Sequence, residues 1–179
     1  MEYFGRRELA IARKKLNEAE SLLSQYYCIP GREWPLYPYG VRTLVDVDEM
    51  ADYGEVLASV SKYEVSTPLR VARSRFDYYE IRLQDHNILL ASSRRGAGIS
   101  FEPLMLYVLT HELVHVFRFA NLPQRFFVSD EEKIREERQV HQITSNILRM
   151  KNESGLAPVL EAYKDYPFQA PFSYPEFRS

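Results

Sequence analysis

Apolar residues recur at helical spacing in the first part of the chain. Across residues 6–27 they follow one another at steps of three and four positions, and the stripe consists of Leu9, Ala12, Leu16, Ala19, Leu23 and Tyr26. This period predicts an amphipathic helix with one buried face. Its basic side chains could contact a membrane or an acidic partner. Because acidic residues are interleaved with them, we interpret them as a solvated face.

Two longer apolar patterns nearer the carboxyl end also predict helices. Residues 101–121 form the most apolar segment, and Pro103 lies near its start, where a missing backbone N–H costs little. A second helix is predicted to begin at Ser129 or Asp130 and to end near Met150. Acidic residues crowd its first turn, as the helix dipole favours.

The segment after the first helix has a mixed pattern. Residues 29–40 contain three prolines and two glycines, which indicate a turn-rich connector. Residues 41–47 are predicted to form a strand. Asp48 could then cap a helix that runs to about Tyr63 and is closed by Pro68.

Residues 71–93 are expected to be β-structure. Polar and apolar residues alternate in the sequence FDYYEIRLQ, which predicts a strand with one apolar row. The tripeptide DHN at 85–87 then predicts a turn, and ILLAS at 88–92 a second strand. A loop is expected over residues 92–98.

Length and composition favour one soluble domain. The chain has 179 residues, of which 45% are hydrophobic and 27% charged, as is ordinary for a globular protein. We expect residues 1–179 to form a single domain, with an N-terminal helix and connector over 1–40. A short helix is expected over 158–164, and residues 165–179 form an irregular tail rich in proline and aromatic residues.

Charge and cysteine content exclude several classes of protein. The net charge of −2 gives no basic excess of the kind that nucleic acid binding requires. The single cysteine, Cys28, rules out an internal disulfide framework and fits a reducing compartment. We see neither a signal peptide nor an apolar run long enough to span a membrane. We therefore expect a cytoplasmic protein that binds neither nucleic acid nor membrane.

The segment THELVHVF holds two of the four histidines of the chain. His111 and His115 are four residues apart, so a helix places them about 6 Å apart along its axis and on one face, from which both could reach one metal ion. Glu112 lies about 100° around the helix and could reach a water molecule on that ion. The plainer alternative is a pair of core histidines beside a glutamate, but a glutamate inside so apolar a helix is costly without a partner.

A catalytic zinc site needs a third protein ligand and an open position. A metzincin site would require glycine at position 118 and histidine at position 121, but the chain has Arg118 and Asn121. The following helix offers Glu136, Glu137 and His141, and the residue pattern leaves the choice among them open. The alternative is an exposed acidic helix with one incidental histidine.

Residues 108–150 resemble the zincin superfamily of zinc peptidases. Within it they are similar to gluzincins, whose third ligand is a glutamate on the helix after H-E-x-x-H, and the size of the chain resembles that of the minigluzincins. The sequence EERQVHQITSNIL resembles the E-x-x-A-N segment of ImmA/IrrE-like peptidases. In that comparison Glu137 is at the position of the metal ligand. Val140 is at the position of the small residue, and His141 is at the position of the polar residue that follows it.

The resemblance implies an α+β fold in which a small mixed sheet packs on a long H-E-x-x-H helix, followed by a ligand-bearing helix. It implies one Zn²⁺ held by His111, His115 and Glu137. His141 would be its hydrogen-bonding neighbour, or the third ligand in place of Glu137.

The expected function is zinc-dependent hydrolysis of a peptide or protein substrate, in which Glu112 is the general base toward a metal-bound water. The alternative is a zinc-holding regulatory or protein-binding module with little turnover. By residue type alone, three side chains could stabilise the negative charge of the transition state: Tyr107, His86 and Arg118. Residues 87–93 are the candidate strand for substrate binding, and the tail could lie across the cleft.

Overall fold

The computed structural model describes residues 2–29, 37–44, 56–68, 73–93, 98–121, 129–151 and 153–164. Within these ranges the chain forms five helices and one three-stranded sheet, so the fold class is α+β. The helices are α1 (Arg6–Tyr26), α2 (Asp85–Ser93), α3 (Phe101–Asn121), α4 (Asp130–Arg149) and α5 (Leu156–Ala162). The strands are β1 (Tyr39–Arg42), β2 (Ala58–Pro68) and β3 (Arg73–Leu83).

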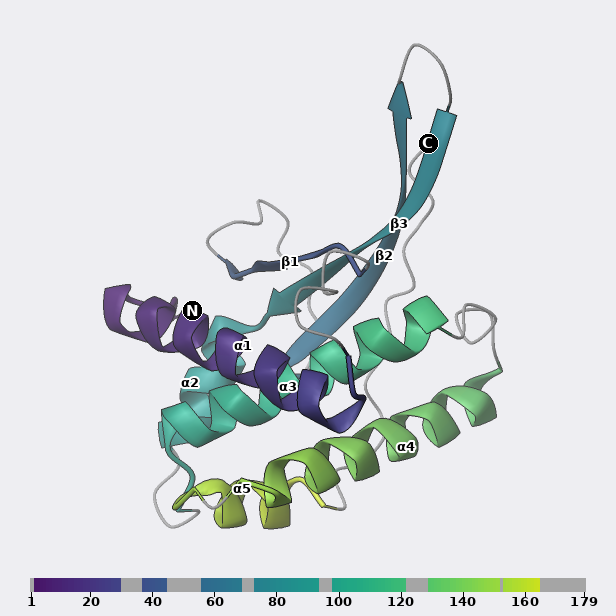
Figure 1. Cartoon of the computed structure of the whole chain (residues 1–179). Coiled ribbons are helices and arrows are strands. Elements are labelled where there is room, and N and C mark those ends of the chain that lie inside the picture. The colour runs from purple at the N-terminus through teal and green to yellow at the C-terminus, as the bar shows by residue number, and fades with distance from the viewer. Residues whose placement is uncertain are drawn as a thin grey trace.

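Helix α3 occupies the middle of the molecule. The sheet lies on one side of it and α4 on the other, while α1 runs beside it (Figure 1). Every residue of α3 from Pro103 to Val116 is buried. A helix that is apolar around most of its circumference is stable only when other elements cover it, and here the sheet and four helices do so.

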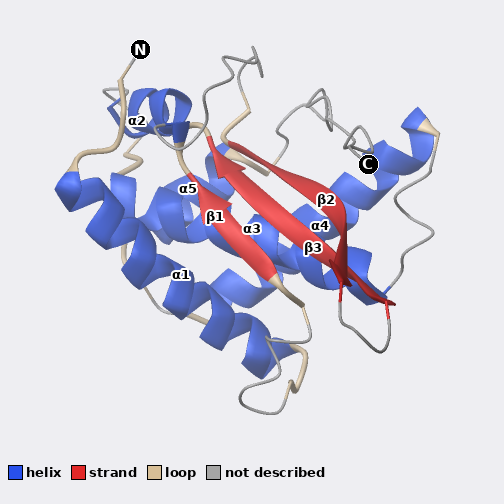
Figure 2. Ribbon diagram, turned by 90° about the horizontal axis from the view of Figure 1, so that it is seen from above, coloured by secondary structure: helices blue, strands red, loops and turns tan. Residues whose placement is uncertain are grey.

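The sheet is mixed and has the strand order β1-β3-β2. β1 pairs with β3 in parallel, and β2 pairs with β3 antiparallel, with Val60 opposite Ile81. One face of β3 carries Tyr79, Ile81 and Leu83, all of which are buried. Figure 2 shows that this sheet lies over α3, with α1 running along its β1 side.

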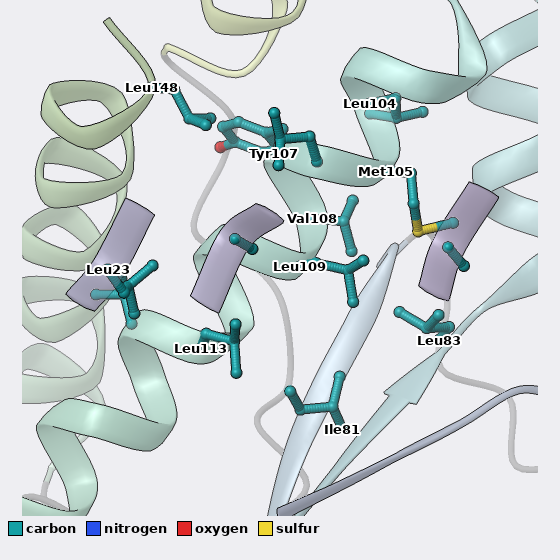
Figure 3. Packing of buried hydrophobic residues seen from close by; sticks show 14 of the residues in the cluster. Leu23, Ile81, Leu83, Leu104, Met105, Tyr107, Val108, Leu109, Leu113 and Leu148 are labelled. Carbon is teal, nitrogen blue, oxygen red and sulfur yellow. The ribbon is translucent and has the colours of Figure 1, made fainter. Parts of the chain in front are cut away.

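The hydrophobic core joins the sheet to all five described helices, and Figure 3 shows part of it. Its fully buried members include Leu23, Ile81, Leu83, Leu104, Met105, Leu109, Leu113 and Leu148. Complete burial of a leucine-sized side chain stabilises the fold by roughly 1.5–3 kcal/mol. The packing of α4 on α3 is therefore part of the main core, and the relative position of the two helices is fixed by it.

A partly buried ion cluster ties α1 to the segment after α4. Lys15 is only 4% exposed, and its Nζ lies 3.1 Å from Glu18 Oε2 and 3.0 Å from Glu153 Oε1. Lys151 contacts both of these glutamates. A lysine this deeply buried requires such partners, so the cluster fixes α1 against the turn that leads into α5.

Helices α1, α3 and α4 confirm the predicted helices, and β3 confirms the predicted strand in residues 71–93. Ser129 is the N-cap of α4, and its hydroxyl accepts a hydrogen bond from the backbone nitrogen of Glu132. Helix α5 begins two residues before the predicted start at Pro158. The tail at 165–179 lies outside the described residues.

The predicted helix from Asp48 to Tyr63 is wrong over its second half. Residues 58–63 belong to β2, where the long antiparallel ladder with β3 satisfies the backbone groups that a helix would have satisfied internally. Residues 48–55 lie outside the described part of the chain. The predicted strand 41–47 is shorter and begins earlier, since β1 ends at Arg42, and residues 45–47 are also not described.

The predicted turn at 85–87 and strand at 88–92 are also wrong, because these residues form α2. Asp85 is fully buried at the start of this helix. Its carboxylate accepts backbone N–H groups from Phe4 at 2.9 Å and Leu44 at 3.2 Å. These distant contacts fix the chain at Asp85 and favour a helix start, which a local pattern of apolar residues could not reveal. Among the described helices, none has both the length and the apolar character to cross a bilayer.

Candidate metal centre

Helix α3 places His111 and His115 side by side. Their Nε2 atoms are 3.2 Å apart, and their side chains are 9% and 1% exposed. The i, i+4 spacing brings both rings to the face of α3 that meets α4. The two imidazole nitrogens therefore converge in a buried environment, as a shared metal ion would require.

Helix α4 adds the carboxylate of Glu137 to this pair. Its Oε1 lies 3.0 Å from His111 Nε2, and its Oε2 lies 3.2 Å from His115 Nε2. Val140, three residues later, is fully buried and holds this face of α4 against the core. The packing of the two helices thus brings Glu137 opposite both histidines.

The spacing of these three groups fits a zinc ion. Ligand atoms about 2.0–2.1 Å from a tetrahedral zinc are about 3.3 Å from one another. The two Nε2 atoms are 3.2 Å apart, and each lies close to a different oxygen of the Glu137 carboxylate, His111 3.0 Å from Oε1 and His115 3.2 Å from Oε2. The buried Oε2 of Glu137 has an ion-pair distance to His115 without the geometry of a hydrogen bond. A cation between these atoms would satisfy all three.

His141 reaches the same carboxylate from one turn further along α4. Its Nε2 lies 3.2 Å from Glu137 Oε1, and potential ligand atoms of His111, Glu137 and His141 all lie within 4.8 Å of one another. The structure therefore brings together His111, His115, Glu137 and His141, whereas Glu136, which the sequence also offered, pairs with Arg118. Glu137 is the one that contacts all three histidines, so the geometry favours it over His141 as the central third ligand.

The surroundings of Glu112 and Glu137 shift the pKa values of these two glutamates in opposite directions. Burial alone would raise the pKa of Glu137, but His111 and His115 hold it well below its ordinary value. Burial raises the pKa of Glu112 to about 7; His111 opposes this shift and the Glu137 charge adds to it. Burial also lowers the pKa of His141. Glu137 is thus anionic and suited to a cation, whereas Glu112 is balanced between accepting and releasing a proton near neutral pH.

Aromatic side chains pack around the histidines. Tyr107 stacks near His111, His141 and Tyr163, with ring centroids 6.1, 6.2 and 5.2 Å away. Phe119 stacks on His115 at 5.3 Å. Sequence reasoning missed both Tyr163 and Phe119. The i, i+4 spacing of Phe119 from His115 was a usable signal, whereas nothing local to Tyr163 indicated its position.

Two other candidates have different partners. Arg118 donates to both oxygens of Glu136, at 2.5 and 2.9 Å, and this pair spans α3 and α4. Glu136 therefore pairs with an arginine while its neighbour Glu137 faces the histidines. His86 lies on α2, and its Nδ1 is 3.5 Å from the backbone nitrogen of Glu2.

Comparison with models of known protein families, with curated proteins and with solved structures finds no match to this chain. What the site can do therefore follows from its own donor groups. Two imidazoles and a carboxylate suit Zn²⁺ better than Mg²⁺ or Ca²⁺, which prefer oxygen ligands alone. A second buried glutamate beside such a set matches the needs of hydrolytic chemistry.

Proposed function

We propose that the chain is a zinc-dependent peptidase with a zincin-like arrangement, acting on a peptide or protein substrate in the cytoplasm. The observation that carries this proposal is the convergence of His111, His115 and Glu137 at distances that suit one zinc ion, with Glu112 buried beside them. A cluster of satisfied core histidines would not need a buried glutamate whose pKa is raised to about 7.

Each residue has a defined part in the reaction. His111, His115 and Glu137 would hold the ion. When bound, zinc polarises the scissile carbonyl and makes water a better nucleophile at neutral pH. Glu112 accepts a proton from the attacking water and returns it to the departing amine. A carboxyl group with a pKa of about 7 can perform both transfers near neutral pH.

The edge of the sheet offers a place for the substrate backbone. Among the described strands, β1 and β2 are both at an edge of the sheet, and β2 is the one that packs against α3. An extended peptide can add to such an edge through main-chain hydrogen bonds. This assignment replaces the predicted substrate strand at 87–93, which forms most of helix α2.

Substitution of Glu112 by glutamine tests the proposal most directly. Glu112→Gln keeps the shape of the side chain and removes the base, so zinc content should be unchanged. Cleavage of a fluorescence-quenched peptide library should fall by about 100-fold or more. Glu131→Gln, at an exposed site on α4, is the matched control and should leave cleavage at the wild-type rate.

Measurement of the metal content of the purified protein is a second test of the proposed function. His115→Ala should lose zinc, whereas His86→Ala should retain it. Wild-type protein with almost no metal, not restored by added zinc, would remove the proposal. Equal cleavage by wild type and Glu112→Gln would also contradict it.

A second candidate function is a zinc-holding regulatory or protein-binding module with little turnover. The position of His141 favours it, since four protein ligands would fill a tetrahedral zinc and leave no open position. This alternative predicts stable zinc binding in wild type, Glu112→Gln and Glu131→Gln, with no cleavage by any of them.

A further inference from the structure

Tyr107 and His141 form a contact between helices next to the metal centre. The Tyr107 hydroxyl on α3 lies 2.6 Å from His141 Nδ1 on α4. Tyr107 is one turn before His111, and His141 is one turn after Glu137. The contact therefore joins the helix that carries both metal-binding histidines to the helix that carries the carboxylate.

The two contacts of His141 select one arrangement of its protons. Its Nε2 lies 3.2 Å from Glu137 Oε1, and a carboxylate that holds a cation can only accept hydrogen bonds. The proton of a neutral His141 must then be on Nε2. Nδ1 carries the lone pair, so the Tyr107 hydroxyl is the donor at the other end of the ring.

We propose that Tyr107 is a positioning residue for the metal centre. It acts through His141: the hydroxyl fixes the ring and its tautomer, and Nε2–H then fixes the Glu137 carboxylate opposite His111 and His115. Partners of this kind around a metal ligand commonly set its orientation and the metal affinity. The inference depends on the metal site of the proposed function and not on turnover.

Packing holds the Tyr107 hydroxyl in place. The residue is 4% exposed, and its ring stacks on Tyr163 from the segment after α5. Figure 3 shows the ring beside Leu148 of α4. A ring enclosed on these sides cannot turn its hydroxyl away from His141 without disturbing the core. The short contact is therefore a fixed feature of the interface between α3 and α4.

Removal of the hydroxyl tests the proposal. In Tyr107→Phe the ring and its packing remain, but His141 Nδ1 loses its donor and the ring can adopt the other tautomer. We expect the dissociation constant for Zn²⁺, measured by competition with a chromophoric chelator, to rise about 10–100-fold. The visible spectrum of the Co²⁺-loaded protein should keep its wild-type shape, because the ligand set is unchanged.

A matched control separates this effect from general loss of a tyrosine hydroxyl. Tyr39→Phe removes a hydrogen bond of 2.5 Å to Glu20, between β1 and α1. It should lower thermal stability while leaving the Zn²⁺ dissociation constant at the wild-type value. A loss of affinity equal to that of Tyr107→Phe would assign the effect to stability and overturn the proposal.

His141→Ala completes the experiment. Removal of the His141 side chain, through which Tyr107 acts, should weaken zinc binding by a similar factor. The double variant Tyr107→Phe/His141→Ala should bind zinc no more weakly than His141→Ala alone. If His141→Ala changes the Co²⁺ spectrum, His141 is a metal ligand and the proposal is overturned. Wild-type zinc affinity in Tyr107→Phe, with zinc-dependent cleavage intact, would refute this inference while leaving the proposed function standing.

Discussion

Two adjacent glutamates on α4, Glu136 and Glu137, have different partners. Glu136 is paired with the Arg118 guanidinium, whereas Glu137 faces the imidazoles of His111 and His115. Both are nearly buried, at 6% and 8% exposure, so burial alone does not distinguish them. Each carboxylate therefore has a different partner, and only Glu137 faces the histidines that we propose as metal ligands. The two positions therefore permit a matched comparison in one helix.

We predict that Glu137→Gln abolishes tight zinc binding and that Glu136→Gln does not. The first change removes the anionic ligand, and we expect the zinc dissociation constant to rise more than about 100-fold, beyond the usual effect of a neighbouring residue. Isothermal titration with Zn²⁺ would measure both variants. Equal affinities for the two would show that Glu137 is not a ligand.

Gly155 has a positive φ and lies close to the start of α3. Its φ of 102° lies in the left-handed region, and a Cβ there would lie 2.9 Å from Pro103 Cγ at the start of α3. Gly98 also has positive φ, but the nearest atoms to its Cβ would be 3.7 Å away. Both glycines relieve strain, and only Gly155 also avoids a clash with α3.

We therefore expect Gly155→Ala to destabilise the protein more than Gly98→Ala. Strain alone costs about 1–2 kcal/mol for alanine in the left-handed region, and the contact with Pro103 adds to this at Gly155. Urea denaturation of both variants would measure the difference. Equal losses would mean that the start of α3 yields to the added methyl group without cost.

At the scale of elements, the interface between α3 and α4 decides the geometry of the site. Arg118 donates to Glu136 through Nε and one terminal nitrogen, and the latter also contacts Gln139 at 2.5 Å. This fork bridges the carboxyl end of α3 and the first half of α4. It fixes how α4 is rotated, and hence which of its side chains meet the histidines.

Loss of one partner of this pair should be costly. Arg118→Met leaves Glu136 as a nearly buried charge without its arginine, and we expect a loss of about 3 kcal/mol in the free energy of unfolding. The double variant Arg118→Met/Glu136→Met should recover much of it, because both charges are then absent. Chemical denaturation of the three proteins would show this, and additive losses would mean that the pair is not coupled.

The sequence predicted the elements whose pattern is long and failed for those fixed by distant contacts. Helices α1, α3 and α4 each bury a long apolar face, so their period was sufficient. Residues 58–63 and 85–93 were misassigned, because pairing with β3 decides the first and the contacts of Asp85 decide the second. Short apolar runs fit a helix or a strand equally well until tertiary contacts choose.

In the candidate site too, the features fixed within one helix could be predicted and those fixed by packing between helices could not. The pair His111 and His115 could be predicted because one helix fixes their spacing. The choice between Glu137 and His141 could not, since both lie on one face of α4 and their order around the ion depends on the packing of two helices. The role of Tyr107 toward His141 depends on that packing too.

At the scale of the whole molecule, α1 is held to the segment after α4 by charge as well as by the core. Lys15 and Lys151 share Glu18 and Glu153 in one cluster that joins residues 138 positions apart in sequence. Burial tends to raise the pKa of Glu153, but Lys151 and Lys15 lower it below its ordinary value. The folded state therefore binds this proton less readily than the unfolded state does.

The sign of the resulting pH dependence follows from linkage. A carboxyl group whose folded-state pKa is lowered stabilises the fold above its ordinary pKa, which is 4.5 here, and this stabilisation is lost as the pH falls through the folded-state value. We expect Glu153→Gln to be less stable than wild type in urea denaturation at pH 7, and the difference to shrink below about pH 4.5. Glu161→Gln, at an exposed position on α5, should show no such convergence. A difference for Glu153→Gln that stays constant from pH 7 to pH 3 would mean that the cluster does not depend on the charge of this carboxylate, and that α1 is held by the hydrophobic core alone.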